Sequence, residues 1–188
     1  MRARMALKYA DITVEIREIE LRNKPAHMLQ VSPKATVPVL ISNVGKVIEQ
    51  SLDIMLWALQ KQDNDGWLNA DSALTQQIIV ENDSGFKQAL DKYKYAIRFP
   101  EQSAQVYRAQ GEVFLKKLES LLSQSRFLLG NQIILADIAI FPFIRQFSGV
   151  DSIWYESAPY PRLKACLNTL IESEWFISIM QKQPAYMT

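Results

Sequence analysis

Cysteine and histidine each occur once in this sequence, as Cys166 and His27. A thiolate can attack an electrophile and an imidazole can transfer protons, but both functions need partner groups that activate or orient them. Cys166 lies beside Leu163 and Leu167 at helical spacing, so we interpret its thiol as small core filling rather than as a nucleophile. His27 falls in a loop without a partner motif, and we interpret it as a surface residue rather than as a catalyst.

A serine and an acidic residue mark the start of a predicted helix. The apolar residues that follow Ser51 lie on one helical face, at Leu52, Met55, Leu56 and Leu59. Serine is a preferred N-cap, and an acidic residue in the first turn, here Asp53, interacts favourably with the positive end of the helix dipole. We therefore predict a helix with Ser51 as its N-cap, and capping is the commoner role of a serine in this position.

The segments ahead of this helix predict the rest of a small α/β unit. Met1–Ala10 has apolar residues at helical spacing, and apolar residues alternate with polar ones over Ile12–Arg17, which predicts a helix and then a half-buried strand. Asn23–Pro33 is polar and broken by prolines, and predicts a loop with a helical turn near its histidine. Val37–Ile41 is joined to Lys46–Ile48 through an Asn-Val-Gly sequence, which predicts a β-hairpin.

Helices dominate after a polar stretch, residues 61–71, which we predict to be a linker. The predicted helices share apolar residues three or four positions apart, and they are Leu74–Ala96, Tyr107–Leu122, Leu163–Ile171 and Trp175–Met180. Gly85 weakens the middle of the first of them. The aromatic-rich segment Val150–Pro161 predicts a loop.

The most apolar stretch of the chain, residues 130–147, predicts the central helix of this helical part. A helix that is apolar all round is a buried one. Asp137 lies near its start, where a carboxylate accepts hydrogen bonds from first-turn N–H groups and stabilises the helix by roughly 0.5 to 2 kcal/mol. Pro142 lies inside it, where it removes one backbone hydrogen bond, so packing must accommodate the break.

Composition excludes several classes of function. The 188 residues carry a formal net charge of +1 without a run of Lys and Arg, so we expect no nucleic-acid partner. No apolar run approaches the roughly 20 residues that span a bilayer, and the start lacks the apolar core of a signal peptide, so we expect no membrane association and no export. A single cysteine fits a reducing cytoplasm.

These patterns predict an α+β protein, with a small α/β unit over residues 1–60, the linker over residues 61–71, and an all-helical unit over residues 72–188. They narrow the choice of fold without naming a function.

Three motifs in order, KATVPVL, EQSLDIMLWAL and LADIAIFPFIRQF, make the chain similar to the glutathione S-transferase family, in its bacterial branch related to the omega and glutaredoxin-2-like members. The resemblance implies a thioredoxin-like domain followed by the family's helical C-terminal domain. It also implies glutathione as cosubstrate without a metal, a small electrophilic or disulfide substrate, and a homodimer.

The resemblance implies a glutathione site as well. In this family the bond that matches Val37–Pro38 is cis, and the backbone of Val37 pairs with the cysteinyl part of glutathione like an added strand. Gln50 and Ser51 match a pair that binds the γ-glutamyl carboxylate at a helix N-terminus. Asp53 either pairs with the ligand ammonium or only caps its own helix. The alternative for Val37–Pro38 is a strand entered through a turn.

A second site is less directly implied. Tyr93 and Tyr95 are candidates to line the pocket for the acceptor substrate, and packing in the core or at an interface is the alternative.

The sequence also departs from the family pattern. The family has a first strand and a loop with the catalytic residue ahead of the helix that matches residues 2–7, and the resemblance assigns no such residue here. We therefore expect unpaired strand edges at Ile12–Arg17 and Val37–Ile41, and little transferase activity from these 188 residues. Ile134 replaces the family's Ser or Thr N-cap, so Asp137 must serve alone. Two functions stay open: a glutathione-dependent transferase or thiol oxidoreductase in the complete form, and a catalytically silent binding or regulatory scaffold.

Overall fold

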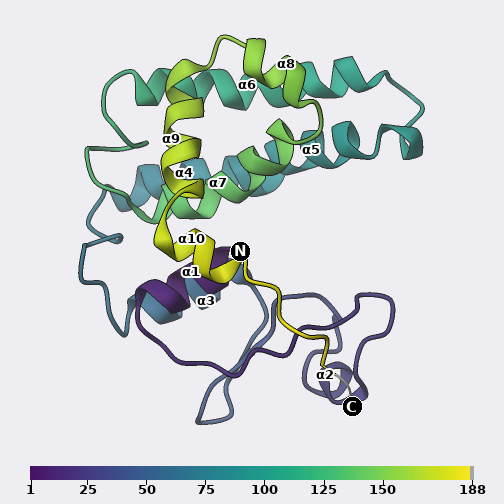
Figure 1. Cartoon of the computed structure of the whole chain (residues 1–188), viewed down its shortest axis with the longest axis vertical. Coiled ribbons are helices and arrows are strands. Elements are labelled where there is room, and N and C mark those ends of the chain that lie inside the picture. The colour runs from purple at the N-terminus through teal and green to yellow at the C-terminus, as the bar shows by residue number, and fades with distance from the viewer. Residues whose placement is uncertain (187–188) are drawn as a thin grey trace. The chain divides into compact units, whose positions relative to one another are not determined.

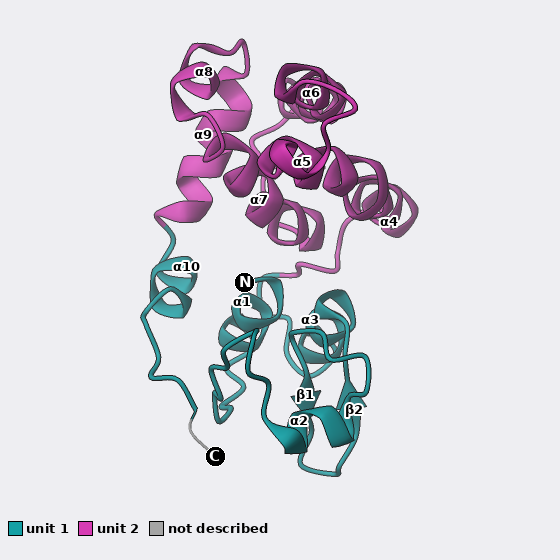
Figure 2. Cartoon of the chain, turned by 90° about the vertical axis from the view of Figure 1, so that its right-hand side faces the viewer, with its two compact units in different colours: residues 1–65, 173–188 teal, residues 66–172 magenta. Residues whose placement is uncertain are grey.

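The computed structural model describes residues 1–186 (Figure 1). The chain forms two compact units, which Figure 2 distinguishes by colour. Unit 1 contains residues 1–65 and residues 173–186, and unit 2 contains residues 66–172. The chain therefore passes into unit 2 within the polar stretch 61–71 and returns to unit 1 for its last helix.

Unit 1 combines helices with one small sheet. Its elements are α1 (Arg2–Tyr9), α2 (Ala26–Val31), β1 (Leu40–Ile41), β2 (Val47–Ile48), α3 (Ser51–Leu59) and α10 (Glu174–Ile179). The N-terminal helix α1 packs against both α3 and α10. Met5 of α1 and Met55 of α3 are fully buried in this core. The helices predicted over Met1–Ala10 and after Ser51 are thus confirmed, and packing on α1 is what places α10 in unit 1.

The predicted hairpin is confirmed, although its strands are short. β1 and β2 pair antiparallel, with Leu40 opposite Ile48 and Ile41 opposite Val47. The N–H of Ser42 donates to the carbonyl oxygen of Lys46 at 2.9 Å and closes the turn. Gly45 adopts φ of +80°, a conformation that glycine reaches without a steric cost.

The strand predicted over Ile12–Arg17 is wrong. Ile12 and Val14 are half-buried between exposed neighbours, but Ile16 is 43% exposed, so the alternation holds only for the first half of the segment. No residue of this segment joins a ladder with another part of residues 1–186. Glu18, just after it, forms a single parallel bridge with Ala185, and the N–H of Tyr186 donates to the carbonyl oxygen of Glu18 at 2.7 Å. An alternating pattern reports burial, but a strand also needs a neighbour with free backbone groups.

All the named elements of unit 2 are helices. Its helices are α4 (Ser72–Glu81), α5 (Lys87–Lys94), α6 (Ala104–Leu122), α7 (Leu135–Ser148), α8 (Ser152–Ser157) and α9 (Pro161–Ile171). A π-helical segment, Asn82–Phe86, joins α4 to α5, and a 3₁₀ turn, Ala96–Arg98, follows α5. The single helix predicted over Leu74–Ala96 is therefore nearly continuous, with its irregular turn at the predicted weak point, Gly85.

The apolar helix α7 lies at the centre of unit 2, as predicted, and packs against α4, α5 and α9. Its side chains are buried on all sides, and Pro142 is accommodated inside the helix. The segment Val150–Pro161 was predicted to be a loop and instead contains α8. This helix forms because the Asp151 carboxylate accepts the Trp154 N–H at 3.0 Å and because Tyr155 is buried against the rest of the unit.

Gly111 of α6 allows a close approach to a buried aromatic ring. A Cβ atom at this position would lie 2.4 Å from Cε2 of Phe147, which is fully buried and contacts the rings of Phe86 and Tyr93. We expect Gly111→Ala to lower the free energy of unfolding by about 1 to 3 kcal/mol, because the ring has no room to move. Urea unfolding followed by circular dichroism measures the change.

The matched control is Gly85→Ala, because a Cβ atom at Gly85 would meet nothing within 4 Å. This exchange should leave the stability unchanged or raise it by up to about 1 kcal/mol. Equal stabilities of the two variants would show that the contact between Gly111 and Phe147 does not limit packing.

Within residues 1–186 no helix is both long enough and apolar enough to cross a membrane, and no group of three or more potential metal ligands occurs.

Candidate functional site

Val37 presents free backbone groups in unit 1. The Val37–Pro38 bond is cis, as expected from the family resemblance. The N–H and C=O groups of Val37 form no hydrogen bond with the rest of residues 1–186, and its side chain is about half exposed, at 48%. Unpaired, accessible backbone groups next to a strand can pair with the backbone of a peptide.

The start of α3 presents a second set of free groups. Gln50, with φ of −107° and ψ of 136°, is the N-cap residue, and its side chain forms no capping hydrogen bond. Ser51 was predicted to be the N-cap and is instead the first helical residue, because the extended backbone continues through Gln50. Ile54 is the first residue whose N–H bonds back, to the carbonyl oxygen of Gln50 at 3.0 Å. The N–H groups of residues 51–53 therefore point out of the helix without an acceptor in the described chain, as first-turn groups do.

The side chains around the start of α3 are polar and accessible. Ser51 is half-buried, whereas Gln50 and Asp53 are exposed. Asp53 lies in the first turn, as predicted. This end of α3 thus combines a hydroxyl, an amide, a carboxylate and free N–H donors at the positive end of a helix dipole, which favours an anionic group.

A part-buried hydrogen bond connects the segments that precede the two sets. The Ser32 hydroxyl donates to Glu49 Oε1 at 2.7 Å, and Lys34 Nζ lies 3.3 Å from Glu49 Oε2. The hydrogen bond from Ser32 lowers the pKa of the Glu49 carboxyl, so it stays ionised at neutral pH. This contact links the loop that leads to Val37 with the residue that precedes Gln50. Nothing in the sequence marked Ser32 and Glu49, because a contact across 17 positions has no local signal.

The two tyrosines proposed for the acceptor pocket differ in their surroundings. Tyr93 of α5 is buried and lines a hollow in unit 2, together with Arg108. Tyr95 follows α5, is exposed, and lies beneath the cationic groups of Lys94 and Arg98, at 5.1 and 4.9 Å from its ring centroid. Tyr95 does not line the hollow, so the two side chains do not share a pocket there.

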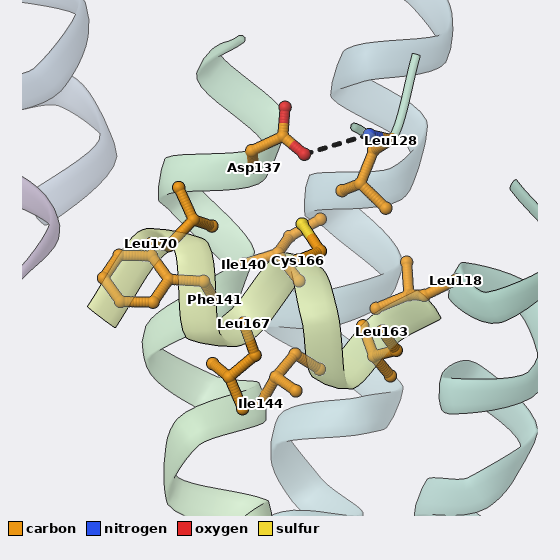
Figure 3. A pocket seen from close by; sticks show the side chains of 10 residues that line it. All are labelled: Leu118, Leu128, Asp137, Ile140, Phe141, Ile144, Leu163, Cys166, Leu167 and Leu170. Atoms are coloured by element: carbon orange, nitrogen blue, oxygen red, sulfur yellow. Dashed lines mark hydrogen bonds between the residues drawn. The ribbon is translucent and has the colours of Figure 1, made fainter. Parts of the chain in front are cut away.

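Cys166 lies in the core of unit 2, as interpreted from the sequence. Its side chain borders a cavity of about 20 Å³ that is otherwise apolar apart from Asp137 (Figure 3). The residue is 8% exposed, and burial raises the pKa of its thiol to about 12. A thiol that stays protonated is a poor nucleophile, and this one packs against Leu163 and Leu167 instead.

We expect Cys166 to react with the thiol reagent 5,5′-dithiobis(2-nitrobenzoate) at least about 100-fold more slowly in the folded protein than in urea. The absorbance of the released thiolate follows the reaction. Labelling at the rate of the unfolded chain would show that the thiol is accessible, contrary to its burial.

His27 lies on α2 and has no catalytic partner among the described residues. Its Nε2 is 3.4 Å from Arg17 Nη1, and its ring contacts the ring of Tyr186 at a centroid distance of 5.6 Å. Neither a guanidinium nor an aromatic ring orients an imidazole as a general base, and we keep the interpretation of His27 as a non-catalytic residue.

Asp137 supports the start of α7 from within the core. Its two carboxylate oxygens accept the N–H groups of Leu128 and Ile134, each at 3.0 Å (Figure 3 shows the first). Ile134, the N-cap residue, contributes no side-chain hydrogen bond, so Asp137 serves alone, as predicted. Burial raises the pKa of this carboxyl to about 6, against the effect of the N–H groups of Leu128, Ile134 and Asp137 itself.

Two family models match this chain. The model of the glutathione S-transferase N-terminal domain matches residues 1–66, and the model of the glutathione S-transferase C-terminal domain matches residues 101–165. Together they cover more than half of the sequence. The chain belongs to the glutathione S-transferase family.

The proteins with similar sequences include a glutathione S-transferase and an elongation factor. Glutathione S-transferase U19 of Arabidopsis thaliana is 28% identical, over 93% of this chain and 81% of its own length. Elongation factor 1-gamma of Drosophila melanogaster is 24% identical over 97% of this chain. The chain spans only 42% of the length of that elongation factor.

Solved structures share the fold. Glutathione transferase URE2P6 from Phanerochaete chrysosporium, in complex with oxidised glutathione, superimposes with a TM-score of 0.79 at 21% sequence identity, covering 95% of this chain and 88% of that one. The small sheet and its helices thus correspond to the thioredoxin-like N-terminal domain of a glutathione S-transferase, and the helices of unit 2 to its C-terminal domain. The predicted α+β fold class is confirmed.

Proposed function

We propose that unit 1 binds glutathione as a cosubstrate and that the protein serves as a glutathione-dependent transferase or thiol oxidoreductase for a small electrophilic or disulfide substrate. The observation that carries this proposal is that unit 1 contains two sets of free groups: the backbone of Val37 and the N–H groups at the start of α3. The three sequence motifs support a place in the bacterial branch related to the omega and glutaredoxin-2-like members.

The chemistry of a tripeptide matches these groups. Val37 offers one N–H and one C=O, the complement of the cysteinyl residue in an extended peptide. The γ-glutamyl carboxylate fits the start of α3, where the Ser51 hydroxyl, the Gln50 amide and the free N–H groups are donors. Asp53 would repel a carboxylate and attract an ammonium group, so we assign it to the amino group of the same glutamyl residue.

The sulfur nucleophile comes from glutathione itself in this proposal. Cys166 is not that nucleophile, because its buried thiol stays protonated. In conjugation the glutathione thiol loses its proton, its sulfur bonds to the electrophilic carbon, and the leaving group departs with its electron pair. We assign no catalytic residue among residues 1–186. We further propose a cytoplasmic location, in keeping with a single cysteine, and a homodimer, which the family resemblance implies.

Calorimetric titration of the purified protein with glutathione, followed by assays with chlorodinitrobenzene and with a small disulfide, tests the proposal. Saturable binding with turnover of either substrate supports the enzyme and would show that the low transferase activity expected from the sequence is wrong. Saturable binding without turnover of either substrate would assign the protein to the silent scaffolds instead. The absence of binding would overturn the glutathione site.

A further inference from the structure

A hollow of about 440 Å³ lies in unit 2, apart from the cavity beside Cys166. Three segments that are distant in sequence meet there: the end of α5, the beginning of α6, and the turn between α7 and α8. The lining residues are Tyr93, Ala104, Gln105, Arg108 and residues 149–153. All of them belong to unit 2, so the site does not depend on the glutathione site proposed for unit 1.

Two buried polar atoms at this hollow lack a short acceptor among residues 1–186. Neither the Tyr93 hydroxyl, on a residue only 5% exposed, nor the Nε–H group of Arg108 has a hydrogen-bond partner within 3.5 Å there. Such groups are uncommon, because leaving one unpaired costs about 1 to 3 kcal/mol. Burial raises the pKa of Tyr93 and the neighbouring guanidinium of Arg108 opposes the rise, so the hydroxyl stays protonated and able to donate. A ligand with an acceptor oxygen would satisfy both groups.

Arg108 is held in place by its neighbours. Its guanidinium lies over the ring of Trp154, 4.4 Å from the centroid, and Nε is 3.5 Å from Glu112 Oε1, an ion pair beyond good hydrogen-bonding distance. Glu112 also accepts the Tyr160 hydroxyl at 2.9 Å. The positive charge of Arg108 is therefore balanced by the Glu112 carboxylate, while its Nε–H group still lacks an acceptor at short hydrogen-bonding distance.

The exposed edge of the hollow carries a negatively charged acceptor. Asp151 is exposed and lines the hollow, and its Oδ1 accepts the Trp154 N–H while Oδ2 has no partner in the described chain. Its negative charge disfavours a simple anion and favours an ammonium group. Ala104, Val150 and Ile153 supply apolar surface, and the Ile153 side chain is 85% exposed without a ligand. Covering such surface is favourable.

We propose that this hollow binds a small zwitterionic amino acid with an apolar side chain. Its carboxylate accepts from Tyr93 and Arg108, its ammonium group lies at Asp151, and its side chain covers Ile153. This site goes beyond the function proposed for unit 1.

Titration of the ¹⁵N-labelled protein with L-leucine tests the site. We expect the amide signals of Tyr93 and residues 149–153 to shift and saturate at millimolar leucine, with unit 1 unaffected. Two matched probes lack one charged group each: 4-methylpentanoate has no ammonium group, and isoamylamine has no carboxylate. Both should bind at least about fivefold more weakly, the equivalent of one hydrogen bond. Equal binding of 4-methylpentanoate would overturn the zwitterion assignment, and no shift with any probe would overturn the site.

Variants test the individual contacts. Tyr93→Phe and Asp151→Asn should each weaken leucine binding at least about fivefold, and asparagine can still cap α8. Tyr95→Phe is the control, because Tyr95 does not line the hollow, and it should bind leucine as the parent does. Unchanged affinity in Tyr93→Phe would contradict the proposal. If a variant fails to fold, the relative affinities of the parent protein for leucine, 4-methylpentanoate and isoamylamine still test the proposed site.

Discussion

Replacing Asp137 by alanine lowers the free energy of unfolding by about 2 to 4 kcal/mol, because it leaves the buried N–H groups of Leu128 and Ile134 without acceptors. This is a large part of the roughly 5 to 15 kcal/mol that stabilises a typical domain. Urea unfolding at neutral pH measures the loss. The matched control is Asp71→Ala, since Asp71 caps α4 through one exposed hydrogen bond to the Leu74 N–H at 2.9 Å. That exchange should cost about 1 kcal/mol.

The same variant also tests the protonation of Asp137. Its pKa in the folded protein, about 6, lies above the value of 3.8 for a free carboxyl. A group whose pKa is raised by folding stabilises the folded state most when it is protonated, so its contribution falls as the pH rises from below 4 through 6. The difference in stability between the parent and Asp137→Ala should therefore be larger at pH 4.5 than at pH 7.5. A difference that does not change with pH would contradict the raised pKa.

Changing Ser51 to alanine should weaken glutathione binding by about 1 to 3 kcal/mol, a rise in Kd of roughly 5- to 150-fold. The lost hydroxyl is one of the donors that we assign to the γ-glutamyl carboxylate. Calorimetric titration of parent and variant measures the change, and a thermal unfolding curve checks that the variant remains folded.

Ser72→Ala is the matched control for this experiment. Ser72 is the first residue of α4, as Ser51 is of α3, and it lies in unit 2. It should leave the affinity for glutathione unchanged. Equal affinities of the parent and Ser51→Ala would show that Ser51 only begins its helix.

Local patterns predicted most of the elements. The helices α1, α3, α6, α7 and α9 follow from apolar spacing, and the hairpin follows from β-branched residues around an Asn-Val-Gly turn. In each case the signal and the structure lie within the same few residues. The first helical residue of α3 differed from the prediction by one position because the side-chain preference of a serine does not fix where extended backbone ends.

The failures depend on contacts between distant residues. The segment Ile12–Arg17 alternates in burial only at Ile12 and Val14, and it has no partner ladder in the described chain. The helix α8 depends on Tyr155 being buried and on Trp154 lying beneath Arg108 of α6. Aromatic composition alone gave no sign of either contact.

The residues of the candidate sites also differ in whether a local sequence pattern identifies them. Val37, Gln50 and Ser51 were identifiable because they lie in short motifs around a hairpin and a helix start. The contact between Ser32 and Glu49 was not, and the hollow at Tyr93 was not, because Arg108 and Asp151 reach it from another helix and another turn. Tyr95 lies two residues from Tyr93 and was a candidate for the same pocket, but only Tyr93 lines the hollow in unit 2.

The central claim is that glutathione binds unit 1 at Val37 and at the start of α3. Titration of the ¹⁵N-labelled protein with glutathione, followed by two-dimensional NMR, tests it residue by residue. We predict saturable shifts of the amide signals of Val37, Gln50, Ser51 and Asp53, with the signals of residues 149–153 unmoved. Shifts confined to unit 2, or no shift of these four signals at millimolar glutathione, would contradict it.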